Sequence, residues 1–155
     1  MNFTPQITKT KNPDGSYIDG QRMESIIKYM IPVAKLVTFQ HDQNIYDAMN
    51  IMIEKQISGA PVMEDDEFVG IISEKDCLQV LCDVVYNQME RARKITVADY
   101  MSKRIEVVSN KADVLEVAEK FIHSHYRRFP VVDEDNILIG QISRRDILRA
   151  AIDMK

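Results

Sequence analysis

The stretch NIYDAMNIMIEKQISGAPVM, Asn44–Met63, decides the fold because the chain contains its pattern twice. The segment DVLEVAEKFIHSHYRRFPVV, Asp113–Val132, aligns with it without a gap. After one additional residue in the second copy, GIISEKDCL at Gly70–Leu78 aligns with GQISRRDIL at Gly140–Leu148. An internal repeat of this length indicates one structural unit built twice. Two such units can face each other as a pseudo-symmetric pair, and we expect equivalent loops to line a shared cleft.

Each copy predicts the order strand, helix, strand, strand, helix. Both first helices carry apolar residues at the spacing i, i+3, i+4, i+7, i+8, which is typical of a helix that buries one stripe. These residues are Ile45, Ala48, Met49, Met52 and Ile53, and then Val114, Val117, Ala118, Phe121 and Ile122. A short acidic turn joins the next two strands into a predicted hairpin. The closing helices have matching apolar sets, Cys77, Leu78, Leu81 and Cys82, and then Ile147, Leu148, Ala151 and Ile152.

The repeat defines the predicted domain plan. Residues 1–20 are polar and turn-rich and are predicted to form a flexible N-terminal arm. The first unit is expected over residues 21–92 and the second over residues 93–155. A helix is expected to start near Asp19 and to end at Pro32, because apolar residues recur there at helical spacing. One unit of this size would be marginally stable alone, so packing of the two sheets against each other is expected to complete the core.

Composition excludes several classes of function. The net charge is −4, which argues against a broad nucleic-acid-binding face. No apolar run is long enough to cross a membrane and no secretory leader opens the chain, so we expect a cytoplasmic protein. The only cysteines, Cys77 and Cys82, do not match a metal site and are predicted to be a buried, reduced pair. His123 and His125 lie two positions apart on a helix and point to different faces, which argues against a metal pair. The chain carries no Walker loop and no recognisable pairing of nucleophile and base, so we expect no enzyme activity and no required cofactor.

The sharpest local pattern is G-x-I-S-x-x-D, which occurs at Gly70–Asp76 and at Gly140–Asp146. A serine followed three residues later by an acidic residue is a helix-capping signature. The same position also suits a ligand, because a helix start offers free N–H groups to phosphate and an aspartate there can accept hydrogen bonds from a ribose diol. Capping and ligand contact do not compete, and the duplication of the pattern favours ligand contact by at least one aspartate.

At this point the chain resembles a tandem pair of CBS domains, the regulatory modules named after cystathionine beta-synthase. The match rests on the strands Ile57–Val62 and Tyr126–Val131, on the two G-x-I-S-x-x-D segments, and on the dipeptides Tyr29-Met30 and Tyr100-Met101. It covers nearly the whole chain apart from the arm. The resemblance implies an α/β (α+β) fold of two β-α-β-β-α units packed sheet to sheet. It also implies a homodimer of such modules and an adenosine-containing ligand such as AMP, ADP, ATP or S-adenosylmethionine.

The resemblance further implies two clefts, each combining a first strand and a pre-proline segment from one unit with the S-x-x-D of the other. One cleft would contain Thr38, Gln40, Ser58, Gly59, Ala60, Ser143, Arg145 and Asp146. The other would contain Val108, Ser109, Arg127, Arg128, Phe129, Ser73, Lys75 and Asp76. The first strand of related proteins often carries Thr or Ser; Thr38 fits this pattern, whereas Val107 stands at the matching place in the second unit.

Arginine placement suggests that the clefts differ. Arg127 and Arg128 precede Pro130, whereas the first unit has the uncharged pair Ser58-Gly59 there. Guanidinium groups suit phosphate oxygens, so the cleft with Asp76 is expected to favour a phosphorylated ligand. The expected function is therefore a sensor of an adenosine-type small molecule that signals through its own dimer or a separate protein effector. The alternatives are an interaction scaffold with vestigial clefts, in which the motif only caps helices, and an enzyme acting on a nucleotide.

Overall fold

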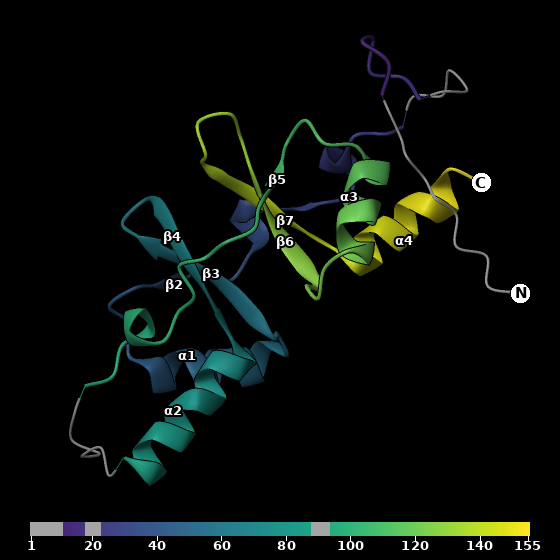
Figure 1. Cartoon of the computed structure of the whole chain (residues 1–155). Helices are drawn as coiled ribbons and strands as arrows, with labels where there is room; N and C mark the ends of the chain where they lie inside the picture. Colours follow the sequence, from purple (N-terminus) through teal and green to yellow (C-terminus); the bar gives the residue numbers. More distant parts are fainter. Residues whose placement is uncertain (1–10, 18–22, 88–93) are drawn as a thin grey trace, which may run out of the picture.

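The computed structural model describes residues 11–17, 23–87 and 94–155, which form two units of the same plan (Figure 1). The first unit consists of β2 (Phe39–Gln40), α1 (Ile45–Lys55), β3 (Gly59–Glu64), β4 (Glu67–Ser73) and α2 (Glu74–Tyr86). The second unit consists of β5 (Val108–Ser109), α3 (Val114–Ile122), β6 (Arg128–Val132), β7 (Leu138–Ser143) and α4 (Arg144–Asp153). The predicted α/β class and the β-α-β-β-α order of both units are confirmed.

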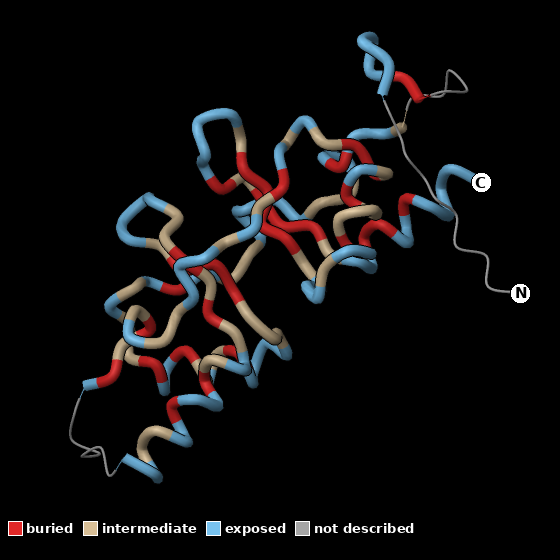
Figure 2. The backbone as a smooth tube through the Cα atoms, in the orientation of Figure 1, coloured by how far each residue is buried: buried red, intermediate tan, exposed pale blue. Residues whose placement is uncertain are grey.

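Two sheets lie between the helix pair α1 and α2 and the helix pair α3 and α4 (Figure 1). The first sheet has the strand order β2-β3-β4, and the second has the order β1-β7-β6-β5, where β1 is the short strand Ile31–Pro32. In both units the first strand runs parallel to the second, and the hairpin strands are antiparallel. Buried residues follow the strands and the helix sides that face them, whereas the acidic hairpin turns are exposed (Figure 2).

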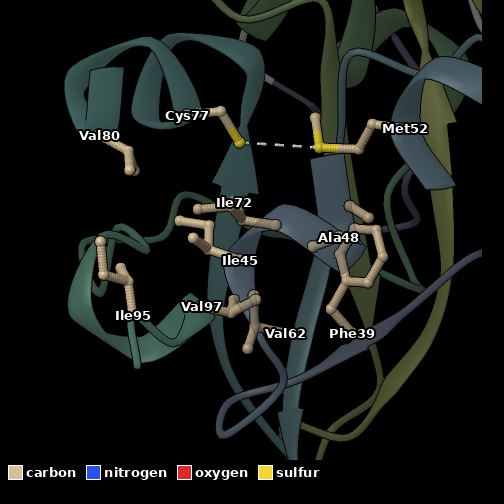
Figure 3. Packing of buried hydrophobic residues seen from close by; sticks show 11 residues of the cluster. Phe39, Ile45, Ala48, Met52, Val62, Ile72, Cys77, Val80, Ile95 and Val97 are labelled. Carbon is tan, nitrogen blue, oxygen red and sulfur yellow. Dashed lines mark hydrogen bonds between the residues drawn. The ribbon is translucent and has the colours of Figure 1, made fainter. Parts of the chain in front are cut away.

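Each unit's opening segment packs into the core of the other unit. Ile26, in the 3-10 turn η1 (Ile26–Lys28), is fully buried in the core of the second unit. Ile95 and Val97, around the turn η3 (Val97–Asp99), are buried in the core of the first unit. Figure 3 shows Val97 next to Val62 of the first sheet, and Ile95 belongs to the same cluster. Each core is therefore completed by the opening segment of the other unit.

Backbone pairing also joins the opening segment of each unit to the sheet of the other unit. Strand β1 pairs antiparallel with β7 of the second unit. An isolated bridge joins Ser102 to Ile71 in β4 of the first unit, with N–H to carbonyl distances of 2.8 and 3.0 Å. Gly140 in β7 and Gly70 in β4 lie at the two crossings. A Cβ at Gly140 would lie 2.5 Å from the carbonyl oxygen of Ile31, so this crossing requires glycine.

The first helices bury the predicted stripe except at its last position. In α1, Ile45, Ala48 and Met52 are buried, whereas Ile53 is 75% exposed. In α3 the equivalent Ile122 is 76% exposed. With 3.6 residues per turn, position i+8 is rotated by about 80° from position i, which places it at the edge of the buried stripe. The expectation was therefore wrong at this one position in both units.

The predicted stripe of the second helices is wrong for most of its members. In α2 the buried apolar residues are Cys77 and Val80, and in α4 they are Ile147 and Ala150. Four of the predicted apolar residues, Leu78, Leu81, Leu148 and Ile152, are between 61% and 70% exposed. Each of these helices carries two neighbouring apolar stripes, and only one of them faces its sheet. The other stripe forms an exposed apolar face.

The two cysteines also separate between these stripes. The Cys77 thiol is buried and donates a long hydrogen bond of 4.0 Å to the sulfur of Met52 (Figure 3). Cys82 is exposed, so the predicted buried pair is wrong for this residue. Both cysteines are free thiols.

The segment before the first unit differs from the predicted helix. Among residues 23–32, which the structure describes, the 3-10 turn η1 stands in place of the predicted helix, and β1 follows it because the chain extends to reach β7. The predicted helix start near Asp19 lies outside the described residues. In the arm, the Nζ of Lys11 lies 2.6 Å from Oδ2 of Asp113, and the Tyr17 hydroxyl lies 3.0 Å from both oxygens of that carboxylate. Residues 11–17 thus contact the start of α3.

Over the described ranges, no helix combines the length and the hydrophobicity that crossing a membrane would require. The same residues contain no group of three or more His, Cys, Asp or Glu side chains that could hold a metal ion.

Candidate functional site

Both S-x-x-D motifs form complete capping boxes at the starts of α2 and α4. The N–H and the hydroxyl of Ser73 donate to Oδ2 of Asp76 at 2.8 Å each, and the Asp76 N–H donates back to the Ser73 hydroxyl at 3.3 Å. Ser143 and Asp146 repeat this arrangement at 2.8, 2.7 and 3.2 Å. The predicted capping role is therefore confirmed, and it fixes one oxygen of each aspartate at the start of its helix.

The pre-proline segment of each unit lies beside the helix start of the same unit. Gly59 pairs with Ser73, and the Ser58 carbonyl accepts the N–H of Glu74 at 3.0 Å. In the second unit the Arg127 carbonyl accepts the N–H of the first helical residue at 3.1 Å. A Cβ at Gly59 would lie 2.9 Å from the carbonyl oxygen of Ile72, so glycine allows β3 to approach β4 closely here.

One side chain joins the two units at this place. The Nη2 of Arg128 donates to the hydroxyl of Ser58 at 2.9 Å, across the boundary between the units. Burial lowers the pKa of Arg128, as does neighbouring Arg127, while the carboxylates of Glu74 and Asp146 raise it. The backbone of Arg128 pairs with Ser143 at the start of α4, and its guanidinium reaches Ser58, whose carbonyl accepts the N–H of Glu74 at the start of α2. The two helix starts and the two pre-proline segments are therefore linked by a continuous set of contacts.

The two motif aspartates have different surroundings. Asp146 is buried, with 2% of its surface exposed, and its Oδ1 accepts a hydrogen bond from Nη1 of Arg149 at 2.9 Å. Asp76 is only half-buried, and no described residue donates a hydrogen bond to its Oδ1. Both oxygens of Asp146 are thus engaged, whereas Asp76 keeps one acceptor free.

Several other predicted site residues have side chains that are exposed or are turned toward a neighbouring loop. Four of them, Thr38, Gln40, Lys75 and Arg145, are exposed and take part in no described hydrogen bond of their side chains. The hydroxyl of Ser109 accepts the N–H of Lys111 at 3.2 Å and is therefore turned toward the β5–α3 loop.

Three predicted site residues belong to the cores instead. Ala60 is 3% exposed and Val108 is 4% exposed. Phe129 is fully buried, with its ring centroid 4.7 Å from that of Phe121. Their side chains pack away from solvent, so only their backbones can face a ligand.

Sequence reasoning missed Arg149, the partner of Asp146. Its spacing of i+3 on a helix was the available signal, because side chains at that spacing are neighbours. The equivalent residue in the first unit is Gln79, whose amide donates to Asp83 at 2.9 Å rather than to Asp76.

A separate apolar groove lies between α1 and α2. Its volume is about 370 Å³, and it is lined mainly by apolar side chains, including Tyr46, Met49, Ile53, Leu78 and Leu81. The groove contains part of the exposed apolar face of α2 and extends to Glu74 at the start of that helix.

Comparison with known proteins gives a family match in both units. The CBS domain family matches residues 26–83 and 97–153. CBSX2, a chloroplastic CBS domain-containing protein of Arabidopsis thaliana, is 27% identical over 150 residues, covering 82% of this chain and 63% of CBSX2. The chain therefore spans less than two thirds of that relative's length. The crystal structure of CBSX2 in complex with AMP is 27% identical and has a TM-score of 0.73, covering 84% of this chain and 97% of that chain.

Two further similarities define the extent of the match. An inosine-5'-monophosphate dehydrogenase of Methanocaldococcus jannaschii is 30% identical over 120 residues, covering 77% of this chain but only 22% of the enzyme. That match is confined to the CBS part of the dehydrogenase, so it transfers no catalytic centre. A CBS domain-containing protein of Bacillus anthracis, at 22% identity, has a TM-score of 0.72, covers 85% of this chain and 94% of its own, and supports the fold alone.

Proposed function

The chain belongs to the CBS domain family, and on that premise we propose that it is a regulatory module that senses an adenosine-containing small molecule. The observation that carries the proposal is the link between the two units beside the starts of α2 and α4. Arg128 reaches across to Ser58 there, next to the two capped aspartates. The AMP complex of CBSX2, a relative with the same fold, supports adenosine as the ligand's common part.

The chemistry of the site fits the parts of a nucleotide. The free Oδ1 of Asp76 can accept hydrogen bonds from a ribose diol, in the way that an acidic residue does in dinucleotide-binding folds. Arg127, which the predicted cleft combines with Asp76, is exposed and can bind phosphate oxygens through its fork of N–H donors. We propose AMP, ADP, ATP or S-adenosylmethionine as the ligand, with a phosphorylated ligand favoured by Arg127. No cofactor is required in this proposal.

Isothermal titration calorimetry with AMP, ATP and S-adenosylmethionine tests the proposal. Asp76→Asn keeps an acceptor for the Ser73 cap but converts the second oxygen into a donor, so affinity should fall about tenfold or more. Asp66→Asn, in the exposed hairpin turn, is the matched control and should bind as the unaltered chain does. Absence of binding by all three compounds, or equal binding by Asp76→Asn, would refute the sensor.

We also propose that the exposed apolar faces of the helices pair two copies of the chain. Leu78, Leu81 and Val85 on α2 and Leu148 and Ile152 on α4 are each at least 61% exposed. Equivalent faces on both units allow a second copy to cover both at once, as a closed two-fold dimer requires. Ligand binding would then shift the population between dimer geometries by its difference in affinity for them. A separate protein effector could read that shift.

Analytical ultracentrifugation tests the dimer. Leu81→Glu places a charge in the apolar face and should produce monomers, because burying an unpaired charge is costly. Ile137→Glu is the control, since Ile137 is 55% exposed in a hairpin turn outside the helices. A dimer without any adenosine binding would favour the scaffold alternative with vestigial clefts. A monomer at all concentrations would contradict the dimer. The free thiols of Cys77 and Cys82 fit the reducing cytoplasm that we propose as its compartment.

A further inference from the structure

The two units carry the same S-x-x-D motif, but their aspartates do not offer the same acceptor atoms. The starting point is the Oδ2 of each aspartate, which is occupied by the serine of its own capping box. Only the Oδ1 atoms can therefore receive a new hydrogen bond without uncapping a helix. The state of these two atoms decides whether a ribose can bind at either helix start.

At Asp146 the Oδ1 is already paired. Arg149 donates to it at 2.9 Å, and the carboxylate side chain is 3% exposed. A hydrogen bond between two charged groups is about twice as strong as a neutral one. A carboxylate oxygen can accept two hydrogen bonds, so Arg149 leaves one acceptor position on Oδ1. A ribose diol donates two hydrogen bonds, so it would have to displace this stronger, charged donor from a buried carboxylate.

At Asp76 the Oδ1 has no such partner among the described residues, and the residue is half-buried rather than closed. The difference arises from one position in the repeat. Gln79 stands where Arg149 stands in the second unit, and its amide turns the other way along α2 to Asp83. The neutral glutamine thus leaves Oδ1 of Asp76 without a donor, whereas the cationic arginine donates a hydrogen bond to Oδ1 of Asp146.

A second contact engages both clefts. The Ser58 hydroxyl, which belongs with Asp146 in the predicted cleft, accepts a hydrogen bond from Arg128, which belongs with Asp76. This contact does not distinguish the two clefts, so the difference between them rests on the oxygens of the two aspartates.

We propose that each chain holds one adenosine ligand, at Asp76, and that Arg149 closes the equivalent position at Asp146. This inference rests on the proposed sensor function and specifies which of its two clefts is used. Arg149 acts here as a specificity-determining residue that touches the acceptor rather than the ligand.

Calorimetry of the full chain with AMP measures both the stoichiometry and the affinity. The unaltered chain should bind one AMP per chain. Gln79→Arg transfers the closing residue to the first unit and should weaken binding about tenfold or more, because Asp76 then gains a charged partner. Gln79→Ala is the matched control, since it removes the amide without adding a donor, and it should bind like the unaltered chain.

Arg149→Gln gives the reciprocal test, because it recreates the first unit's arrangement in the second. We expect a second AMP to bind, and Asp146→Asn in the same chain should remove it again. Thermal melting of every variant establishes that it is folded. Two equivalent sites in the unaltered chain, an unaffected Gln79→Arg variant, or a stoichiometry of one in folded Arg149→Gln would each overturn the inference while leaving the sensor function intact. Absence of AMP binding in all variants would instead refute the sensor and this inference with it.

Discussion

Replacing Gly140 with alanine should destabilise the protein by loosening the crossing of β1 over β7. The added Cβ would lie 2.5 Å from the carbonyl oxygen of Ile31 and 2.9 Å from the sulfur of Met30. The first of these is a backbone atom, so β1 itself must move. Overpacking of this kind costs about 1–3 kcal/mol. Alanine also lowers the conformational entropy of the unfolded chain, which stabilises the folded protein by about 0.4–1 kcal/mol.

The net loss of stability should therefore be about 1–2 kcal/mol, which corresponds to a fall in melting temperature of about 2–8 °C for a chain of this size. Gly70→Ala is the matched control at the equivalent crossing. Its Cβ would first meet the flexible end of Met101, at 2.7 Å from the sulfur, and the Ser102 carbonyl oxygen only at 3.0 Å. Gly70→Ala should therefore lower the stability clearly less than Gly140→Ala does.

Calorimetric or circular-dichroism melting of both variants measures the difference, and hydrogen exchange shows whether the amide of Ile31 loses protection in Gly140→Ala. If Gly140→Ala melts like the unaltered chain, or if Gly70→Ala proves the more damaging change, the argument from close backbone approach is wrong.

Two further predictions concern thiols and pH. A thiol reagent should modify the exposed Cys82 in the native protein. Burial raises the pKa of Cys77 and should delay its reaction until the protein unfolds. Mass spectrometry follows both reactions, and equal rates would contradict this prediction. Burial opposes ionisation of Asp113, but hydrogen bonds from Lys11, a backbone amide and Tyr17 outweigh it and lower its pKa. The arm therefore adds stability that is present above the ordinary carboxyl pKa and lost as the pH falls through the lowered value, and Lys11→Ala should raise the Asp113 pKa in an NMR titration. Burial and the bond to Asp113 raise the pKa of Tyr17 to about 12, so Tyr17→Phe should remove a step near pH 12 from the tyrosinate absorbance titration.

The sequence was informative where two copies of one pattern could be compared. The repeat predicted both units, and the serine and aspartate of each S-x-x-D predicted helix starts that form complete capping boxes. These features depend on residues close together in the chain, so local rules describe them well.

Features that depend on the other unit were not predictable in the same way. Leu78 and Val80 are both apolar and lie two positions apart in α2, and only packing against the sheet decides that Val80 is buried and Leu78 is exposed. The link between Arg128 and Ser58 joins residues far apart in the chain, and no spacing rule connects them. The pairing of Asp146 with Arg149 is local, but an exposed arginine at that spacing has many possible partners.

The exchanged opening segments have a consequence for how this protein can be divided. A cut between residues 92 and 93 would separate the two units, yet each fragment would carry away the segment that fills the core of the other. The first fragment would lack Ile95 and Val97, and the second would lack Ile26. Neither half is expected to be a self-sufficient folding body, and mixing the two separately purified halves should restore structure that neither shows alone. The duplication has thus produced two units that depend on each other for a complete core, rather than two independent domains in sequence.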